Sequence, residues 1–202
     1  MDDTWHALRA TPIREARRRA AIVSELTYNE PTTVDDAERF AWNDGGGQST
    51  VWYFVPDGRA LLLTFDPEAD LSVGWDQYDE QESLYRDVPD DLVHLARNRP
   101  PNHESSNVTD RETGDRIHWA CGVFWFDDEQ WRVAEGLLDH CDQTGVDPMI
   151  GSAFDYCLGV YRFGRDFLTP EEVVEDQTSG WFIDADEGDE LAVVQRIFAR
   201  YG

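Results

Sequence analysis

Two histidines and a glutamate in the middle of the chain are the best candidates for acid–base chemistry. His103 and Glu104 are neighbours in a polar stretch, and His118 follows at the end of that stretch. A histidine beside a carboxylate can serve as a general base, because its pKa lies close to neutral pH. These residues support one hypothesis: a small hydrolase, or a protein that binds a sugar-like small molecule, with the loop 99–118 at its site. A solvated loop histidine explains the same pattern without catalysis.

Histidine and cysteine side chains also raise the question of a zinc site. The candidate ligands are His118, Cys121, His140, Cys141 and Cys157. His118 and Cys121 are three positions apart on an expected strand, so their side chains point to opposite faces of the sheet. His140 and Cys141 are adjacent on an expected helix and diverge as well. We therefore predict no metal site and no cofactor, and we expect the cysteines to be buried free thiols.

The basic residues exclude several enzyme classes in their usual form. All 17 are arginine, and the sequence contains no lysine. A phosphate-binding P-loop needs a lysine after its last glycine, and a protein kinase needs one on a strand. Enzymes that use pyridoxal phosphate or a Schiff base need a lysine amine.

The balance of charge limits the partners of the protein. The 202 residues include 42 acidic and 17 basic side chains, which gives a formal net charge of −25. This charge repels the phosphates of nucleic acids, so we expect no nucleic-acid partner. Basic proteins, cations or a very salty cytoplasm are compatible with it. An acid-rich composition without lysine is also typical of GC-rich bacterial genomes and of halophiles, where it has no functional meaning.

Acidic and aromatic side chains are interleaved between residues 75 and 91. Tyrosine and tryptophan are favoured at the centres of interfaces, and surrounding carboxylates steer a basic partner towards them. The expected partner-binding residues are the first members of this stretch: Trp75, Asp76, Tyr78, Asp79, Glu80, Glu82 and Tyr85. A solvated helix face with two aromatic residues packed into the core is the alternative explanation.

These observations lead to a main hypothesis of a non-enzymatic, acidic binding protein. It would engage a basic protein partner through the acidic and aromatic surface, as an inhibitor or an immunity protein does. The longest apolar stretches are far shorter than the roughly 20 residues that cross a bilayer, and the chain does not begin with a signal-peptide pattern. We therefore expect a cytoplasmic protein with no membrane contact. The sequence leaves the oligomeric state open.

A chain of this length forms one domain with its own core. An aromatic and β-branched run at 48–55 and an apolar run at 60–65 flank the tight-turn sequence Pro-Asp-Gly-Arg at 56–59, and together they predict a β-hairpin over 48–65. The hairpin interrupts any regular alternation of strands and helices. This order favours an α+β fold with a mostly antiparallel sheet, with the hairpin at its centre and helices around it.

Helical spacing of apolar residues predicts helices at both ends of the chain. The first begins at Thr11-Pro12 within the N-terminal segment 1–30, and the last covers 187–200. One face of the first helix is basic and carries Arg14, Arg17, Arg18 and Arg19. This face either lies across an acidic surface of its own domain or docks onto a partner.

Weaker patterns predict the remaining elements. Helices are expected at 76–85, 89–97 and 129–143, with a short one opening at Thr169-Pro170. Strands are expected at 117–126, 153–163 and 181–183, and 33–42 fits either a short helix or a strand. The segment 99–116 is expected to be a long polar loop, a feature that is often functional.

Overall fold

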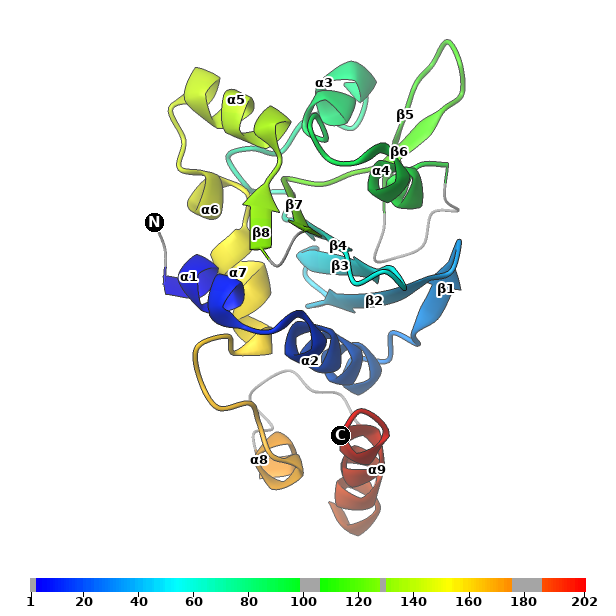
Figure 1. Ribbon diagram of the computed structural model, residues 1–202, viewed down its shortest axis with the longest axis vertical. Helices are drawn as coiled ribbons and strands as arrows, with labels where there is room; N and C mark the ends of the chain where they lie inside the picture. The colour runs from blue at the N-terminus through cyan, green and yellow to red at the C-terminus, as the bar shows by residue number, and fades with distance from the viewer. Residues whose placement is uncertain (1–2, 99–105, 128–129, 176–186) are drawn as a thin grey trace.

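A six-stranded antiparallel sheet forms the centre of the computed structural model, which describes residues 3–98, 106–127, 130–175 and 187–202 (Figure 1). Its strand order is β1-β2-β3-β4-β7-β8. The strands are β1 (Thr32–Val34), β2 (Ala37–Asn43), β3 (Ser49–Phe54), β4 (Ala60–Phe65), β7 (Gly122–Asp127) and β8 (Gln130–Val133). A separate two-stranded sheet pairs β5 (Asn107–Thr109) with β6 (Arg116–His118). The expected α+β fold is confirmed.

The predicted hairpin is confirmed and occupies the middle of the sheet. Strands β3 and β4 pair in register from Ser49 opposite Phe65 to Phe54 opposite Ala60. Gly58 closes the turn with a φ of +95°, a left-handed conformation that glycine adopts without steric cost.

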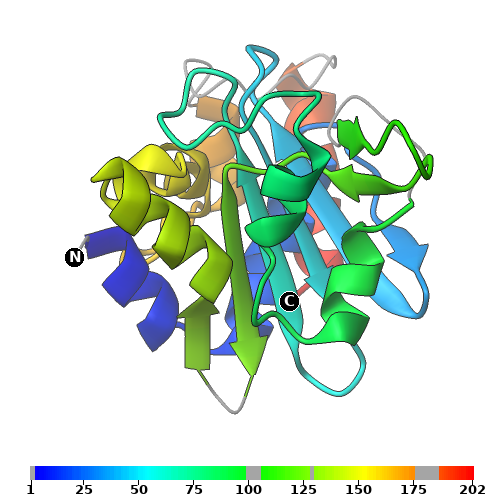
Figure 2. The same ribbon diagram turned by 90° about the horizontal axis from the view of Figure 1, so that it is seen from above.

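Helices cover both faces of the sheet (Figures 1 and 2). One face carries α1 (Asp3–Ala10), α2 (Ile13–Leu26), α7 (Phe154–Leu158) and the short 3₁₀ helix η1 (Gly159–Tyr161). The other face carries α3 (Tyr78–Ser83), α4 (Asp90–Ala96) and the β5–β6 hairpin. Helix α5 (Glu135–Thr144) follows β8 and is succeeded by α6 (Pro148–Gly151). None of the helices in the described ranges has the length and apolar character of a membrane-crossing segment.

Aromatic residues fill the space between the sheet and the helices α1, α2 and α7 that cover one of its faces. Trp52 is fully buried and stacks on Phe54 with a ring-centroid distance of 5.8 Å. The rings of Trp131 and Tyr161 meet Trp52 edge-on at 5.8 and 5.3 Å. Such aromatic contacts contribute beyond the area that they bury.

Helix α2 is buried on two sides because a second helical layer lies outside it. The helices α8 (Pro170–Glu175) and α9 (Glu187–Arg200) form this layer (Figure 1). A second apolar cluster joins the three helices: Ile22, Leu26, Val173, Val194 and Ile197. The expected terminal helices are therefore both present, and α9 has the predicted bounds.

Three of the four arginines on the basic face of α2 contact other parts of the chain. Arg17 forms a two-pronged ion pair with Glu38, with both N–O distances at 2.5 Å. Arg18 lies over the Phe167 ring at 5.9 Å and pairs with Glu15 of its own helix at 3.5 Å. Arg19 pairs with Glu15 at 2.7 Å and donates hydrogen bonds to the carbonyls of residues 161 and 162 at the end of η1. Arg14 is exposed and forms no ion pair with the described residues.

The prediction of a strand at 153–163 is wrong, because this segment forms α7 and η1. Phe154, Cys157, Leu158 and Tyr161 are buried at helical spacing, whereas Tyr156 is 60% exposed. The apparent alternation of apolar residues came from counting Tyr156 as an inward residue.

Two other boundaries differ from expectation. Residues 130–133 form β8, and the helix expected from 129 begins only at Glu135. The expected strand 117–126 is divided into β6 and β7. Segment 33–42 contributes to β1 and β2, and the expected strand 181–183 lies outside the described residues.

Replacing Arg19 with alanine should lower the free energy of unfolding by about 2 kcal/mol, because the variant loses charge-assisted hydrogen bonds to backbone carbonyls. The Arg19 side chain is only 12% exposed. Arg14→Ala removes the same side chain from an exposed position on the same helix, and should change stability by less than about 0.5 kcal/mol. Urea unfolding curves of the two variants test this, and equal losses would contradict the assigned role of Arg19.

Candidate functional site

A closed turn presents Trp75 to solvent. The Gln77 backbone N–H donates to the Gly74 carbonyl at 3.0 Å, and the Gly74 backbone N–H donates to the side-chain Oε1 of Gln77 at 2.7 Å. The Trp119 indole N–H donates to the Val73 carbonyl at 2.8 Å and fixes the residue before the turn. Trp75 itself is 66% exposed. Because these bonds restrain the backbone on both sides of Trp75, binding at this turn costs little backbone entropy.

Helix α3 carries three of the expected carboxylates and turns its opposite side inward. Asp79 and Glu80 are exposed, and Glu82 forms an ion pair with Arg97 at 2.6 Å. Gln81 is fully buried and donates to the Ala120 carbonyl at 3.0 Å. The helix therefore presents its acidic side because Gln81 anchors the other side.

The two tyrosines of the predicted surface have different environments. Tyr78 is half-buried, and desolvation followed by the negative charge of Glu82 raises its pKa. Tyr85 is 3% exposed and donates its hydroxyl to the His118 carbonyl at 2.9 Å. Burial raises the pKa of Tyr85 well above its ordinary value. Tyr85 thus supports the surface from below, whereas the other predicted residues reach solvent at least in part.

A cleft of about 640 Å³ lies between α3 and α4. Asp79, Glu82, Asp87 and Asp90 form its acidic walls, and Val88 and Val93 contribute apolar side chains. Arg86, His94 and Arg97 also line the cleft, and the two arginines pair with Asp139 and Glu82 respectively. Asp79, Asp87 and Asp90 form no ion pair within the described part of the chain, whereas Glu82 is paired with Arg97. The cleft therefore has more acidic than basic side chains beside its apolar lining, and three of its acids have no ion-pair partner among the described residues.

The local sequence between the two helices produces this cleft. Asp87 adopts a φ of +73°, a left-handed conformation that aspartate tolerates better than most residues. Pro89 follows and precedes the first turn of α4. Asp87 and Asp90, on either side of this short connection, both line the cleft.

The histidine candidates for catalysis do not come together among the described residues. His118 is 3% exposed, and burial together with the positive charge of Arg39 lowers its pKa to about 3. The imidazole is therefore neutral and enclosed at physiological pH. His103 and Glu104 lie outside the described residues.

The three cysteines are buried free thiols. Burial raises the pKa of Cys121 and Cys141 to about 11 and that of Cys157 to about 12. In the ranges that the structure describes, no three histidine, cysteine or acidic side chains are grouped as metal ligands would be.

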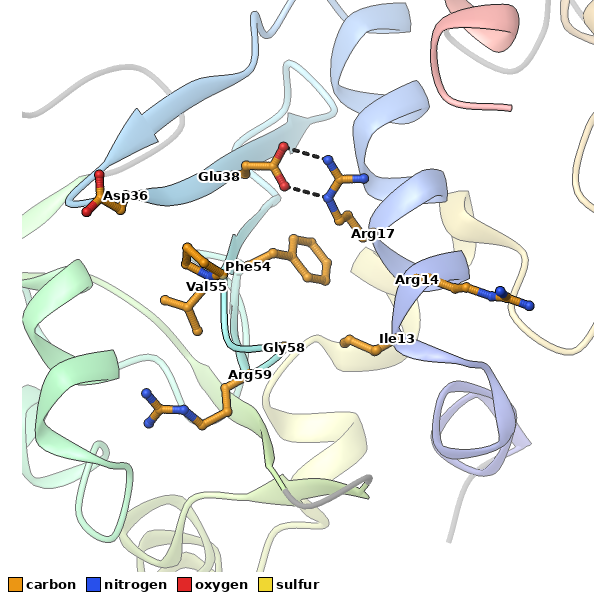
Figure 3. Close-up of a pocket in the computed structure, with 10 residues that line it drawn as sticks. Ile13, Arg14, Arg17, Asp36, Glu38, Phe54, Val55, Gly58 and Arg59 are labelled. Atoms are coloured by element: carbon orange, nitrogen blue, oxygen red, sulfur yellow. Dashed lines mark hydrogen bonds and ion pairs between the residues drawn. The ribbon is translucent and has the colours of Figure 1, made fainter.

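A second groove of about 510 Å³ lies between the start of α2 and the β3–β4 turn (Figure 3). Ile13, Phe54 and Val55 contribute apolar surface, and the Arg17–Glu38 ion pair forms one wall. Arg59 at the rim is held by Asp57 and Asp91 at 2.7 and 2.5 Å. Arg14 and Asp36 also line the groove and carry opposite charges. Because internal carboxylates neutralise Arg17 and Arg59, the groove has no strong preference for one sign of ligand charge.

The partner-binding residues expected from the sequence do not include Asp87, Asp90 or Arg111. The two aspartates lie within the acidic stretch that the sequence marks, beside the proline before an expected helix. Arg111 lies 5.8 Å from the Trp75 ring centroid and 3.2 Å from the Asp76 carboxylate. No signal in the sequence relates Arg111 to Trp75, because the pairing of β5 with β6 creates that contact.

Comparison with known proteins finds no matching family model, no similar curated protein and no similar solved structure. The function must therefore be inferred from the chain's own residues.

We expect His118→Gln to make the protein less sensitive to acid. Folded His118 stays neutral down to about pH 3, whereas the unfolded imidazole binds a proton below about pH 6.5. The wild type therefore loses stability from this residue as the pH falls below 6.5, by about 1.4 kcal/mol per pH unit. Urea unfolding at pH 7 and pH 5 should show the variant gaining on the wild type. His94→Gln, at a side chain that is 67% exposed, is the matched control. An unchanged difference between wild type and His118→Gln would contradict the prediction.

The native protein should resist thiol reagents at pH 8, where its buried cysteines remain protonated. After unfolding in urea, all 3 cysteines should react rapidly. Absorbance after addition of Ellman's reagent measures both rates. Fast reaction of a thiol in the folded protein would show that its site is open.

Proposed function

We propose that this chain is a non-enzymatic binding protein that engages a basic protein partner, in the manner of an inhibitor or an immunity protein. The observation that carries the proposal is the cleft between α3 and α4, where Asp79, Asp87 and Asp90 have no cationic partner among the described residues. Carboxylates left uncompensated in this way favour a partner that brings positive charge.

The lining of the cleft suits a lysine or arginine side chain. The aliphatic stem of such a side chain can lie along Val88 and Val93, while its charged end meets the aspartates at the rim. The net charge of −25 attracts a basic partner at long range and raises the rate of encounter. The cleft then supplies the short-range selection that charge alone does not provide.

Trp75 adds an exposed aromatic anchor close to the acidic helix in sequence. Tryptophan is enriched among residues whose truncation strongly weakens binding. The turn that holds Trp75 outward precedes α3 directly. The proposed interface is therefore the exposed side of α3, the adjoining cleft and the Trp75 turn.

The proposal includes a cytoplasmic location and no nucleic-acid partner, and it leaves the oligomeric state open. The alternative of a small hydrolase or sugar-binding protein around 99–118 stays a prediction, because His103 and Glu104 lie outside the described residues. Burial of His118 does not favour that alternative.

Charge-neutralised variants test the proposal through affinity capture from an extract of the native host. The cleft variant carries Asp79→Asn, Asp87→Asn and Asp90→Asn. The matched control carries Glu30→Gln, Asp166→Asn and Glu175→Gln, three exposed acids elsewhere with no ion pair to described residues. Wild type and control should retain a basic protein that the cleft variant loses. Recovery of no basic protein, or equal recovery by all three proteins, would overturn the proposal.

A further inference from the structure

We propose that the Trp75 ring and the Asp76 carboxylate form a binding site for an arginine side chain of the partner, and that Arg111 of the chain itself occupies this site until the partner displaces it. This inference rests on the proposed function and specifies the chemistry of the partner. It concerns a site beside the cleft, on the turn before α3.

The contact that Arg111 makes defines what the site accepts. Its guanidinium carbon lies 5.8 Å from the centroid of the Trp75 ring, and its Nη2 lies 3.2 Å from Asp76 Oδ2. A planar cation over an indole face, with a carboxylate within hydrogen-bond distance, is an arrangement that suits arginine better than lysine. The chain thus displays the geometry that a partner arginine would adopt.

The backbone holds Arg111 in position from the far side. Its turn joins β5 to β6, where the Asp110 N–H donates to the Asp115 carbonyl at 2.8 Å and the Gly114 N–H to the Asp110 carbonyl at 3.0 Å. The Asp110 carboxylate also accepts from the Glu112 N–H and the Thr113 hydroxyl, both at 2.8 Å. Both the turn at Trp75 and the turn at Arg111 are therefore closed by their own hydrogen bonds.

Solvent exposure makes this internal contact replaceable. Arg111 is 70% exposed at its side chain, Asp76 is 45% exposed, and Trp75 is 66% exposed. Ion pairs and cation–π contacts this open to water are weak. A partner that also contacts the neighbouring carboxylates Asp79 and Glu80 can therefore displace Arg111.

The test uses octa-arginine and octa-lysine, two peptides with equal charge, titrated into the full chain by calorimetry at physiological ionic strength. Wild type should bind octa-arginine more tightly than octa-lysine. Arg111→Ala should strengthen binding of octa-arginine about fivefold and of octa-lysine much less, because it vacates a site selective for the planar guanidinium. Trp75→Ala should abolish the preference for arginine.

The control Arg86→Ala removes another exposed arginine of the same acidic region, one that pairs with Asp139. It should strengthen binding of both peptides equally, since Arg86 lines the cleft, which suits lysine and arginine alike, and makes no contact with Trp75 or Asp76. The inference is overturned if wild type shows no preference for arginine, if Arg111→Ala changes both affinities equally, or if Arg111→Ala weakens binding. If wild type shows no preference for arginine but partner capture still requires Asp79, Asp87 and Asp90, this inference fails and the proposed function stands. Binding that is indifferent to those aspartates would count against the proposed function alone.

Discussion

The short segment from His118, the last residue of β6, to Ala120 anchors helix α3 and the turn that carries Trp75. The His118 carbonyl accepts from Tyr85, the Ala120 carbonyl accepts from Gln81, and the Trp119 indole donates to the Val73 carbonyl. Tyr85 and Gln81 are buried, so loss of either bond would leave a polar group unsatisfied away from water. The Cys121 N–H, next in the chain, donates to the Thr64 carbonyl of β4 and ties this segment to the sheet. These bonds therefore fix α3, which forms one side of the cleft, and the Trp75 turn relative to the sheet.

The two faces of the sheet differ in how many of their charged side chains are paired, and some pairs occur on both faces. On the α2 side, Arg17 and Arg19 find carboxylates or carbonyls of their own domain, and the charges are consumed in holding the layers together. On the α3 side, Asp79, Asp87 and Asp90 have no such partner among the described residues. A large aromatic core offsets the self-repulsion that accompanies a strongly acidic surface. The molecule can therefore leave charge uncompensated on one side without losing its fold.

Elements whose pattern is local were predictable. The hairpin at β3–β4 follows from two apolar runs and a tight turn, and α2 and α9 follow from long helical repeats with clear ends. Errors arose where a short pattern fits two periods. The segment 153–163 alternates in polarity as a strand would. In the structure it is helical, and it buries Phe154, Cys157 and Leu158 while Tyr156 stays exposed. Trp131 fits a helical stripe in the sequence, but pairing with β7 places it on β8.

The sequence by itself determined the enzyme classes that lack of lysine excludes, the sign of any long-range electrostatic attraction and the acidic stretch that carries the candidate surface. Those properties depend on composition and on neighbours along the chain. Only the tertiary structure decided that Tyr85 lies inside, that Asp79, Asp87 and Asp90 share a cleft, and that Arg111 rests on Trp75. Burial and ion pairing depend on distances in space, which the packing of α3, α4 and the β5–β6 hairpin sets between residues that lie far apart in the sequence.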